Sequence, residues 1–345
     1  MRKTLFATLL VILSLCVFSA CSNDDDLIAP KTTHITVLFP PESLCNIGYN
    51  DMTLKAIERY SQKYGYDYLF CVPESIEEGM NYYEYWRESE VDDNISKALF
   101  VFASALYEEP LAKAIHPTSD PQKDLLIFEV AKELPYAYTF AMTYYGASYM
   151  IGSFYLNYAP IEIRIIAANP YVYGLDEIVN GFSAAIEDKT SGTIEVDYLS
   201  QSPEGGFDDD DDAFIECKLA SQDADGRAQL FVPYAGVGNL GVYRFSQSNH
   251  EVAVGVDCID PNTFSHIFLS MNKRVDWALD DFLELWINDG NPPRHRFYSL
   301  ESGRVVVDRA SILNSNSEEI DNLFIQAVAK EKEYFKKQGV DEIYL

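Results

Sequence analysis

Short β-rich runs alternate with amphipathic helical stretches along almost the whole chain, and this alternation restricts the fold more than any other feature. The runs are continuously apolar, as in H-I-T-V-L-F at residues 34–39, which is typical of strands buried on both faces of a sheet. Strands separated by helices form βαβ units with right-handed crossovers, and hence parallel sheets. A first series of strands is expected at 34–39, 67–72, 98–103, 125–130 and 136–142, and a second at 162–167, 193–199, 229–234 and 252–257. The pattern therefore predicts an α/β fold with two doubly wound parallel-sheet lobes.

The tail, residues 264–345, continues the alternation with different spacing. It predicts a strand, an amphipathic helix, two short strands at 296–300 and 304–308, and a charged final helix. Long helical stretches elsewhere are expected near 51–64 and 175–187.

The first 20 residues have the three parts of a secretory signal peptide. Arg2 and Lys3 precede an apolar run at 5–17, which is followed by small residues and Cys21. The run is shorter than the ~20 apolar residues of a membrane span, so we expect cleavage. A cysteine at this position is the bacterial lipoprotein arrangement, so Cys21 is predicted to become a lipid-bearing, palmitate-carrying N-terminus.

Residues 21–30 are predicted to form an acidic tether. The segment Ser22-Asn23-Asp24-Asp25-Asp26 resembles the tag that sends some lipoproteins to the outer face of the outer membrane, and it equally fits a solvated tether. The expected location is the outer membrane, by lipid anchor only, with the cell surface and the periplasmic face both open.

The charge of the chain excludes several classes of partner. The full chain has a formal net charge of −28, and loss of Arg2 and Lys3 with the signal peptide makes it −30. Nucleic-acid binding requires basic surface, so no nucleic-acid partner is expected. The field of such a protein repels anions, which favours a neutral or cationic ligand.

Cysteine and histidine usage predicts no metal site and no cofactor. After processing, Cys45, Cys71, Cys217 and Cys258 remain, without C-x-x-C spacing, and the five histidines are dispersed. Cys45 follows the first expected strand and Cys71 lies near the end of the second. If those strands are neighbours, the two cysteines lie within disulfide range, and we predict this disulfide.

Aromatic residues recur at the carboxyl ends of successive expected strands. In open α/β sheets ligands bind beyond these ends, and aromatic rings there can sandwich a flat ring or a sugar face. The residues concerned are Tyr49, Tyr171, Tyr173, Phe207 and Tyr234. In the same region, Gly236, Gly238 and Gly241 have G-x-G-x-x-G spacing, which we interpret as backbone that a ligand can approach closely at a helix N-terminus.

Three stretches resemble the basic membrane protein family of ABC-transporter substrate-binding lipoproteins. The run F-V-P-Y-A-G-V-G-N-L-G at 231–241 is similar to the family's F-P-x-A-G-G-x-G segment, and 254–257 matches its G-V-D. The most specific match is S-M-N-K-R-V-D-W-A at 270–278, against S-x-x-K-R-V-D-x-A. In order and spacing the resemblance spans roughly residues 35 to 308.

The resemblance implies a type I periplasmic-binding-protein fold, in which two lobes joined by three crossovers close on a ligand by hinge motion. The N-terminal lobe would comprise 31–158 plus about 270–290, and the C-terminal lobe 159–269 plus about 291–345. Better understood members bind purine nucleosides and deliver them to an ABC permease, so a small nucleoside-like ligand is the expected partner.

The resemblance and the strand ends together give the candidate ligand site. Tyr49 and Phe207 would stack on a heterocycle from opposite lobes, Asp257 would accept hydrogen bonds from hydroxyls, and Lys273 would donate. Asn46 stands where the family has an aspartate, and its amide oxygen can still accept. The full candidate set is Asn46, Tyr49, Asn50, Ser104, Asn169, Tyr171, Phe207, Gly236, Asp257 and Lys273.

Two other functional classes remain open at this point. A surface sensor or scaffold could use the same binding fold without a transporter. An exported enzyme would need a nucleophile–base pair or a metal, and the acidic run at 208–212 lacks the ligand spacing of an EF-hand. We therefore predict a binding protein without catalytic residues.

Overall fold

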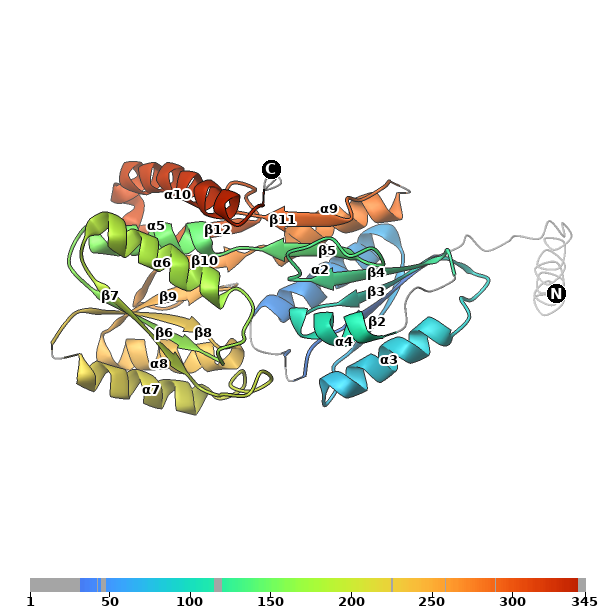
Figure 1. The fold of residues 1–345 in the computed structure, drawn as a ribbon, viewed down its shortest axis with the longest axis horizontal. Helices are drawn as coiled ribbons and strands as arrows, with labels where there is room; N and C mark the ends of the chain where they lie inside the picture. Colours follow the sequence, from blue (N-terminus) through green and yellow to red (C-terminus); the bar gives the residue numbers. More distant parts are fainter. Residues whose placement is uncertain are drawn as a thin grey trace, which may run out of the picture.

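The computed structural model describes residues 32–340, apart from 42, 45–47, 115–119, 225, 258 and 289. The predicted signal peptide, Cys21, the acidic tether, Cys45 and Asn46 lie outside the described residues. Two lobes lie side by side, each built around one six-stranded sheet with helices on both faces (Figure 1). The predicted α/β two-lobe fold class is confirmed.

The N-terminal lobe contains an entirely parallel sheet in the order β11-β5-β4-β3-β1-β2. Its strands are β1 (Thr32–Leu38), β2 (Asp67–Cys71), β3 (Ile95–Phe102), β4 (Lys123–Phe128), β5 (Tyr138–Met142) and β11 (His295–Tyr298). Its helices are α2 (Tyr49–Tyr64), α3 (Ile76–Glu88), α4 (Glu108–Lys113) and α9 (Val275–Ile287), with a short 3-10 turn η1 (Ala105–Tyr107).

The C-terminal lobe repeats this strand order as β12-β10-β9-β8-β6-β7, with only β12 antiparallel among its described pairs. Its strands are β6 (Glu162–Ala167), β7 (Thr193–Tyr198), β8 (Gln229–Tyr234), β9 (Val252–Val256), β10 (Ile267–Lys273) and β12 (Val305–Arg309). Its helices are α5 (Tyr145–Leu156), α6 (Leu175–Lys189), α7 (Asp210–Asp223), α8 (Asn239–Asn249) and α10 (Ser317–Lys337), with 3-10 turns η2 (Gly236–Gly238) and η3 (Ser311–Asn316).

Three short crossovers join the lobes. The first, residues 143–144, links β5 to α5; the second is Arg274, between β10 and α9; the third, 299–304, links β11 to β12. These positions correct the expected lobe boundaries: α5 and β10 belong to the C-terminal lobe, and β11 belongs to the N-terminal lobe. The spacing of apolar residues along a helix or strand shows which of its faces is buried, but not which sheet the element joins. The lobe boundaries therefore could not be predicted from this spacing.

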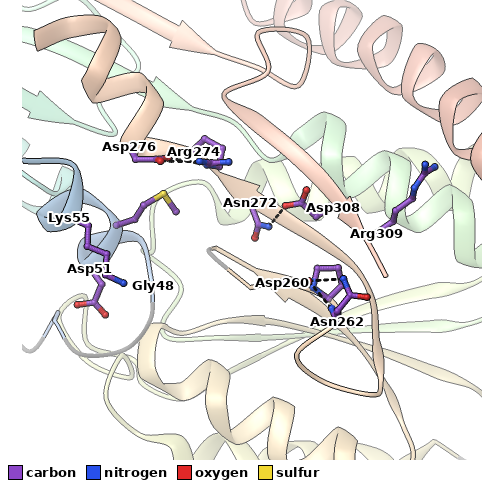
Figure 2. Close-up of a pocket in the computed structure, with 12 residues that line it drawn as sticks. Gly48, Asp51, Lys55, Asp260, Asn262, Asn272, Arg274, Asp276, Asp308 and Arg309 are labelled. Atoms are coloured by element: carbon purple, nitrogen blue, oxygen red, sulfur yellow. Dashed lines mark hydrogen bonds and ion pairs between the residues drawn. The ribbon is translucent and has the colours of Figure 1, made fainter. Parts of the chain in front are cut away.

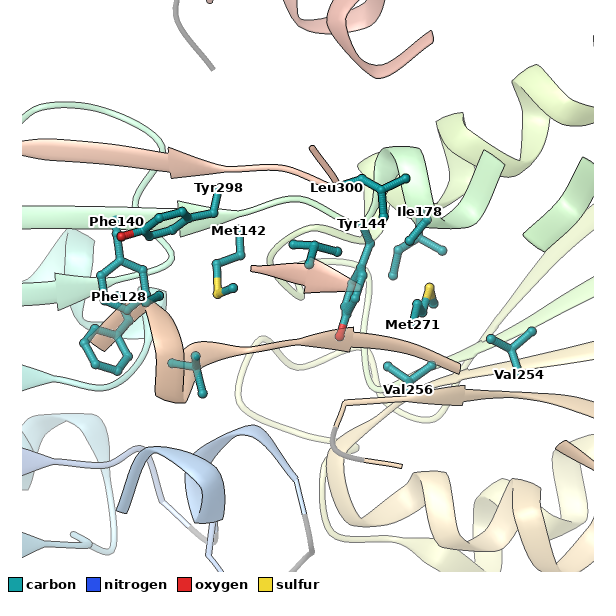
Figure 3. Packing of buried hydrophobic residues seen from close by; sticks show 14 of the residues in the cluster. Phe128, Phe140, Met142, Tyr144, Ile178, Val254, Val256, Met271, Tyr298 and Leu300 are labelled. Atoms are coloured by element: carbon teal, nitrogen blue, oxygen red, sulfur yellow. The ribbon is translucent and has the colours of Figure 1, made fainter. Parts of the chain in front are cut away.

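One apolar core continues from lobe to lobe through the crossovers. Phe128, Phe140 and Tyr298 on the N-terminal side and Val254, Val256 and Met271 on the C-terminal side belong to the same cluster, with Tyr144 between them (Figure 3). In the C-terminal lobe, α5 is buried almost all round because α6 and α10 both pack on it. A Cβ at Gly181 would lie 2.4 Å from the carbonyl oxygen of Tyr145, so only glycine permits the close approach of α6 to α5.

The structure also bears on the cysteines and on the question of a membrane-spanning helix. Cys71 is half-buried and forms no disulfide with another described cysteine; its predicted partner Cys45 lies outside the described residues, so the pairing stays a prediction. Burial raises the thiol pKa of both Cys71 and Cys217. Within the described ranges, no helix is both long enough and apolar enough to span a membrane.

Candidate functional site

A cavity of about 350 Å³ lies between the lobes, where the carboxyl ends of both sets of parallel strands meet. Its volume is near the lower end of the ~300–1,000 Å³ that is usual for small-molecule sites. The N-terminal lobe contributes the start of α2, the η1 turn after β3, and the residue after β4. The C-terminal lobe contributes the segments that follow β6, β7, β8 and β9, together with the end of β10.

Most of the predicted site residues line this one cavity. They are Tyr49, Asn50, Ser104, Tyr171, Phe207, Gly236, Asp257 and Lys273. Their proximity is a structural result, whereas their part in binding stays a prediction. Asn46 lies outside the described residues.

Asn169 is not among the residues that line the cavity. Its amide nitrogen donates to the carbonyl oxygens of Pro203 and Gly205, at 3.2 and 2.9 Å, and its Oδ1 accepts from the N–H of Tyr171 at 2.9 Å. Asn169 therefore braces the two loops that carry Tyr171 and Phe207. An asparagine at a strand end satisfies loop backbone as readily as a ligand, and the sequence does not distinguish the two.

Aromatic rings from both lobes surround the cavity. Tyr49, on the first turn of α2, packs edge-on against Phe128 with ring centroids 6.5 Å apart. Phe207 comes from the loop after β7 in the opposite lobe. The remaining aromatic lining residues are Tyr171, Tyr173, Tyr234 and Tyr243. Such walls suit a ligand that has at least one flat or weakly polar face.

The wall between the two lobes contains a buried charge cluster centred on Lys273. Its Nζ lies 3.2 Å from Oε2 of Glu129, with the lysine side chain only 4% exposed. Tyr144, in the first crossover, donates from its Oη to Oδ1 of Asp257 at 2.5 Å, and the same Oη accepts from the backbone N–H of Lys273 at 3.2 Å. The Lys273 ammonium also sits over the rings of Tyr144 and Tyr173, 4.9 and 5.4 Å from their centroids.

Glu129 is the main site residue that the sequence did not reveal. It directly follows β4, as Asp257 directly follows β9, and β4 and β9 occupy equivalent positions in the two sheets. Both residues adopt left-handed backbone, with φ of 59° and 51°, a conformation that costs free energy for a non-glycine residue and is concentrated at functional sites. The two lobes therefore present one carboxylate each from matching strand ends.

Burial and charge set the protonation of this cluster. Burial raises the pKa of both Glu129 and Asp257, against the attraction of Lys273. Burial alone would lower the pKa of Lys273, but the nearby Glu129 carboxylate and other acidic groups outweigh it and raise that pKa. Lys273 is therefore a cation at neutral pH, paired directly with Glu129 and under the additional attraction of Asp257.

The buried polar atoms of cavity-lining residues that lack a hydrogen-bond partner among the described residues include Oδ1 of Asn50 and Oη of Tyr173. Leaving such an atom unpaired costs about 1–3 kcal/mol. Native proteins seldom leave buried polar atoms unpaired without a reason. A ligand with a donor for Asn50 and an acceptor or donor for Tyr173 would remove this cost.

A second interlobe cavity, about 560 Å³, is larger but chemically different (Figure 2). Polar groups on its walls bond to one another: Arg274 pairs with Asp276 at 2.9 Å, and the Asn272 amide donates to Asp308 at 2.7 Å. It lacks the aromatic rings of the first cavity, and only Gly48 lines both. We therefore place the candidate site in the smaller, aromatic cavity.

The stability of the protein should fall as the pH rises from about 5 to 8. Burial raises the pKa of Glu177 to about 7 and that of Glu331 to about 8, above the values these carboxyls have in an unfolded chain. A raised carboxyl pKa stabilises the folded state below the unfolded pKa, and this stabilisation is lost as the pH passes the folded value. Urea unfolding at pH 5, 6, 7 and 8 should show a decline of up to about 1.4 kcal/mol per pH unit for each such group while it titrates. A flat or rising profile would contradict this prediction.

Among the residues that the structure covers, no group of three histidine, cysteine, aspartate or glutamate side chains could hold a metal ion.

Comparison with known proteins identifies the fold and not the family. No protein-family model and no curated protein matches the chain, so the resemblance to the basic membrane protein family stays a prediction. Solved structures that are similar include an ABC-transporter solute-binding protein from Aeropyrum pernix K1 (TM-score 0.68, 15% identity, 88% of this chain and 86% of that chain). A second is a transcriptional activator of the comK gene from Bacillus halodurans (TM-score 0.62, 17% identity, 86% of this chain and 96% of that chain). A third is GanP, a glucose-galactose binding protein from Geobacillus stearothermophilus (TM-score 0.57, 12% identity, 81% of this chain and 97% of that chain). The chain therefore shares the type I periplasmic-binding-protein fold of these two-lobed proteins.

Proposed function

We propose that this protein is an extracytoplasmic solute-binding protein that holds a small, neutral, nucleoside-like ligand between its lobes. The single observation that carries the proposal is the cavity itself, which combines aromatic rings from both lobes with a buried Lys273–Glu129 pair and Asp257. Solute-binding proteins among the structural neighbours, including the glucose-galactose binding protein, support a binding role. The aromatic rings and the paired charges of the cavity wall favour a binding role over a catalytic one.

The ligand would be recognised by two kinds of contact. Tyr49 and Phe207 would stack on its ring from opposite lobes. Asp257, Glu129 and Asn50 offer oxygen acceptors for hydroxyl or amino hydrogens, while Lys273 and Tyr173 can donate. Because the central ammonium faces two carboxylates, an anionic ligand would add repulsion, and a neutral ligand rich in donors would not.

Isothermal titration calorimetry on the mature protein tests this proposal. The panel contains purine and pyrimidine nucleosides, galactose, glucose and galactofuranose, with amino acids as controls. We expect heat of binding from at least one nucleoside and none from amino acids. If only a sugar binds, the protein is a sugar-binding protein: the nucleoside assignment is wrong, and the binding role stands. No heat from any compound, and no small molecule released from the purified protein on denaturation, would contradict the function.

We further propose that the protein is anchored in the outer membrane through lipids on Cys21 and works with an ABC permease. One residue would carry the anchor. Cys21→Ser should therefore move the protein from the membrane fraction to the soluble fraction, as followed by immunoblotting. A Ser22→Ala variant is the matched control and should stay with the membrane. A Cys21→Ser protein that still fractionates entirely with membranes would show that the lipid anchor is absent.

A further inference from the structure

The C-terminal helix α10 extends from the C-terminal lobe over the hinge. Its buried residues Leu323 and Ala327 belong to the core, and the helix packs along α5. Its final turns lie beside β11, which belongs to the sheet of the other lobe (Figure 1). There Phe335 packs edge-on against Phe297 of β11, with ring centroids 4.7 Å apart. A helix of one lobe is thus in direct apolar contact with the other.

Next to this contact, Glu331 connects the first turn of α5, just after the first crossover, to the third crossover. Its side chain is buried, and Oε1 accepts from the N–H of Gly146 at 3.1 Å while Oε2 accepts from the N–H of Leu300 at 3.0 Å. Gly146 is on the first turn of α5, immediately after the first crossover, and Leu300 is in the third crossover. One carboxyl group therefore holds two chain segments that are 154 residues apart in sequence.

Residues next to Glu331 accommodate or reinforce its two hydrogen bonds. A Cβ at Gly146 would lie 2.8 Å from Oε1 of Glu331, so the carboxyl group occupies the space that any side chain at position 146 would need. The next residue along the helix, Lys332, donates from Nζ to Oε1 of Glu301 at 2.8 Å. Two successive residues of α10 thus hold two successive residues of the third crossover. Tyr334 stacks on Tyr145 at 4.1 Å, beside the first crossover.

We propose that α10 is a strap across the hinge, and that Glu331 limits how far the lobes open by tying the start of α5, which follows the first crossover, to the third crossover. Lobe opening in this fold takes place by changes of backbone angles in the crossovers. Because Leu300 and the first turn of α5 share the Glu331 side chain, the third crossover cannot move freely relative to α5. The Phe335–Phe297 contact must also slide or break as the lobes separate. Glu331 does not line the cavity, so its role is that of a positioning residue.

Burial also raises the pKa of Glu331 to about 8, with the N–H groups of Gly146 and Leu300 opposing the shift and the charges of Glu177 and Glu301 adding to it. The group is therefore mostly a neutral carboxylic acid at pH 7, and it becomes a carboxylate only as the pH rises above about 8.

Hydrogen exchange and small-angle X-ray scattering on the ligand-free mature protein test the proposal. In Glu331→Gln the side chain keeps its size, but its NH₂ group meets a backbone N–H at either Gly146 or Leu300. One of the two hydrogen bonds is then lost and a buried backbone N–H is left without its acceptor, so exchange at that amide should be at least about tenfold faster than in the wild type. The radius of gyration should increase as well. Glu333→Gln is the matched control, since this exposed residue on the same helix pairs only with Lys337 in the described structure.

Gly146→Ala disrupts the same contact while leaving Glu331 in place, because the added methyl group displaces the Glu331 carboxyl group. It should also increase the radius of gyration and the exchange rate at Leu300. Wild-type exchange rates and an unchanged radius of gyration in both variants would overturn the proposal. So would loss of folding in both, by circular dichroism, since the contact would then serve stability and not opening.

The inference deepens the proposed function, because it concerns closure of the same cavity, yet its test needs no ligand. If the calorimetric panel finds no ligand while Glu331→Gln opens the lobes, the binding function fails and the hinge strap stands. If a ligand binds and both variants behave as the wild type, the binding function stands and the hinge strap fails.

Discussion

Replacing Lys273 with methionine should lower the free energy of unfolding by about 3–5 kcal/mol at pH 8, the cost that is usual when one partner of a buried ion pair is removed. Methionine fills a similar volume but leaves the carboxylate of Glu129, 3.2 Å from the lost ammonium, without its counter-ion. Asp257 loses the same nearby positive charge. Urea unfolding followed by circular dichroism measures the loss.

The loss should be smaller at pH 5. Burial raises the pKa of Glu129 and Asp257 even beside the lysine, and without it both can take up a proton more readily. Because raised carboxyl pKa values stabilise the folded state only at low pH, the deficit of the variant should grow from pH 5 to 8. Lys113→Met on α4 is the control, since its side chain is 72% exposed and its loss should change little at either pH. A Lys273→Met protein within about 1 kcal/mol of the wild type at pH 8 would contradict the buried pair.

Removing the ring of Tyr49 should weaken ligand binding by about five- to hundredfold, as expected for the loss of roughly 1–3 kcal/mol of stacking on an aromatic ring. Phe207→Ala should have an effect of similar size, because the two residues reach the same cavity from opposite lobes. Calorimetry with the nucleoside that gives the strongest binding in the panel provides the comparison.

Tyr85→Ala is a matched control for the loss of a tyrosine. Tyr85 lies on α3, is 79% exposed and does not line the cavity, so binding should be unchanged. If Tyr49→Ala binds the nucleoside as tightly as the wild type, the ring has no stacking role and the ligand must lie elsewhere in the cavity.

The strand ends show why much of the site could be predicted from sequence. Parallel βαβ units require buried apolar runs and helical spacing, both of which are visible in the chain, and they place all carboxyl ends at one edge of each sheet. Tyr49, Phe207 and Asp257 therefore meet in the cavity as expected. The rule concerns position along a strand, and it needs no knowledge of which lobe a strand enters.

Glu129 and Gly236 show where sequence reasoning ends. In L-L-I-F-E-V-A, Glu129 looks like a solvent-exposed residue after a strand, and only the fold shows that Lys273, 144 residues later, faces it. Gly236 was expected to permit close approach of a ligand, and its φ of 58° and position at the cavity agree with this. A Cβ there would also lie 2.9 Å from the carbonyl oxygen of Phe207, so the loop after β7 already uses that space. Contacts between distant segments depend on the closed geometry of both lobes, which no local pattern encodes.

The late position of β11 has a consequence for how the chain reaches its native state. During synthesis the segment up to β5 emerges first, but His295 must still arrive beside Thr139 before the first sheet is complete. Until then β5 is an edge strand with unpaired backbone groups and apolar side chains, the kind of edge that recruits other chains. Contacts of such long sequence separation slow folding and lengthen the exposure of that edge. A chain cut before residue 275 therefore has neither α9 nor β11, and its first lobe is left as an incomplete, aggregation-prone intermediate.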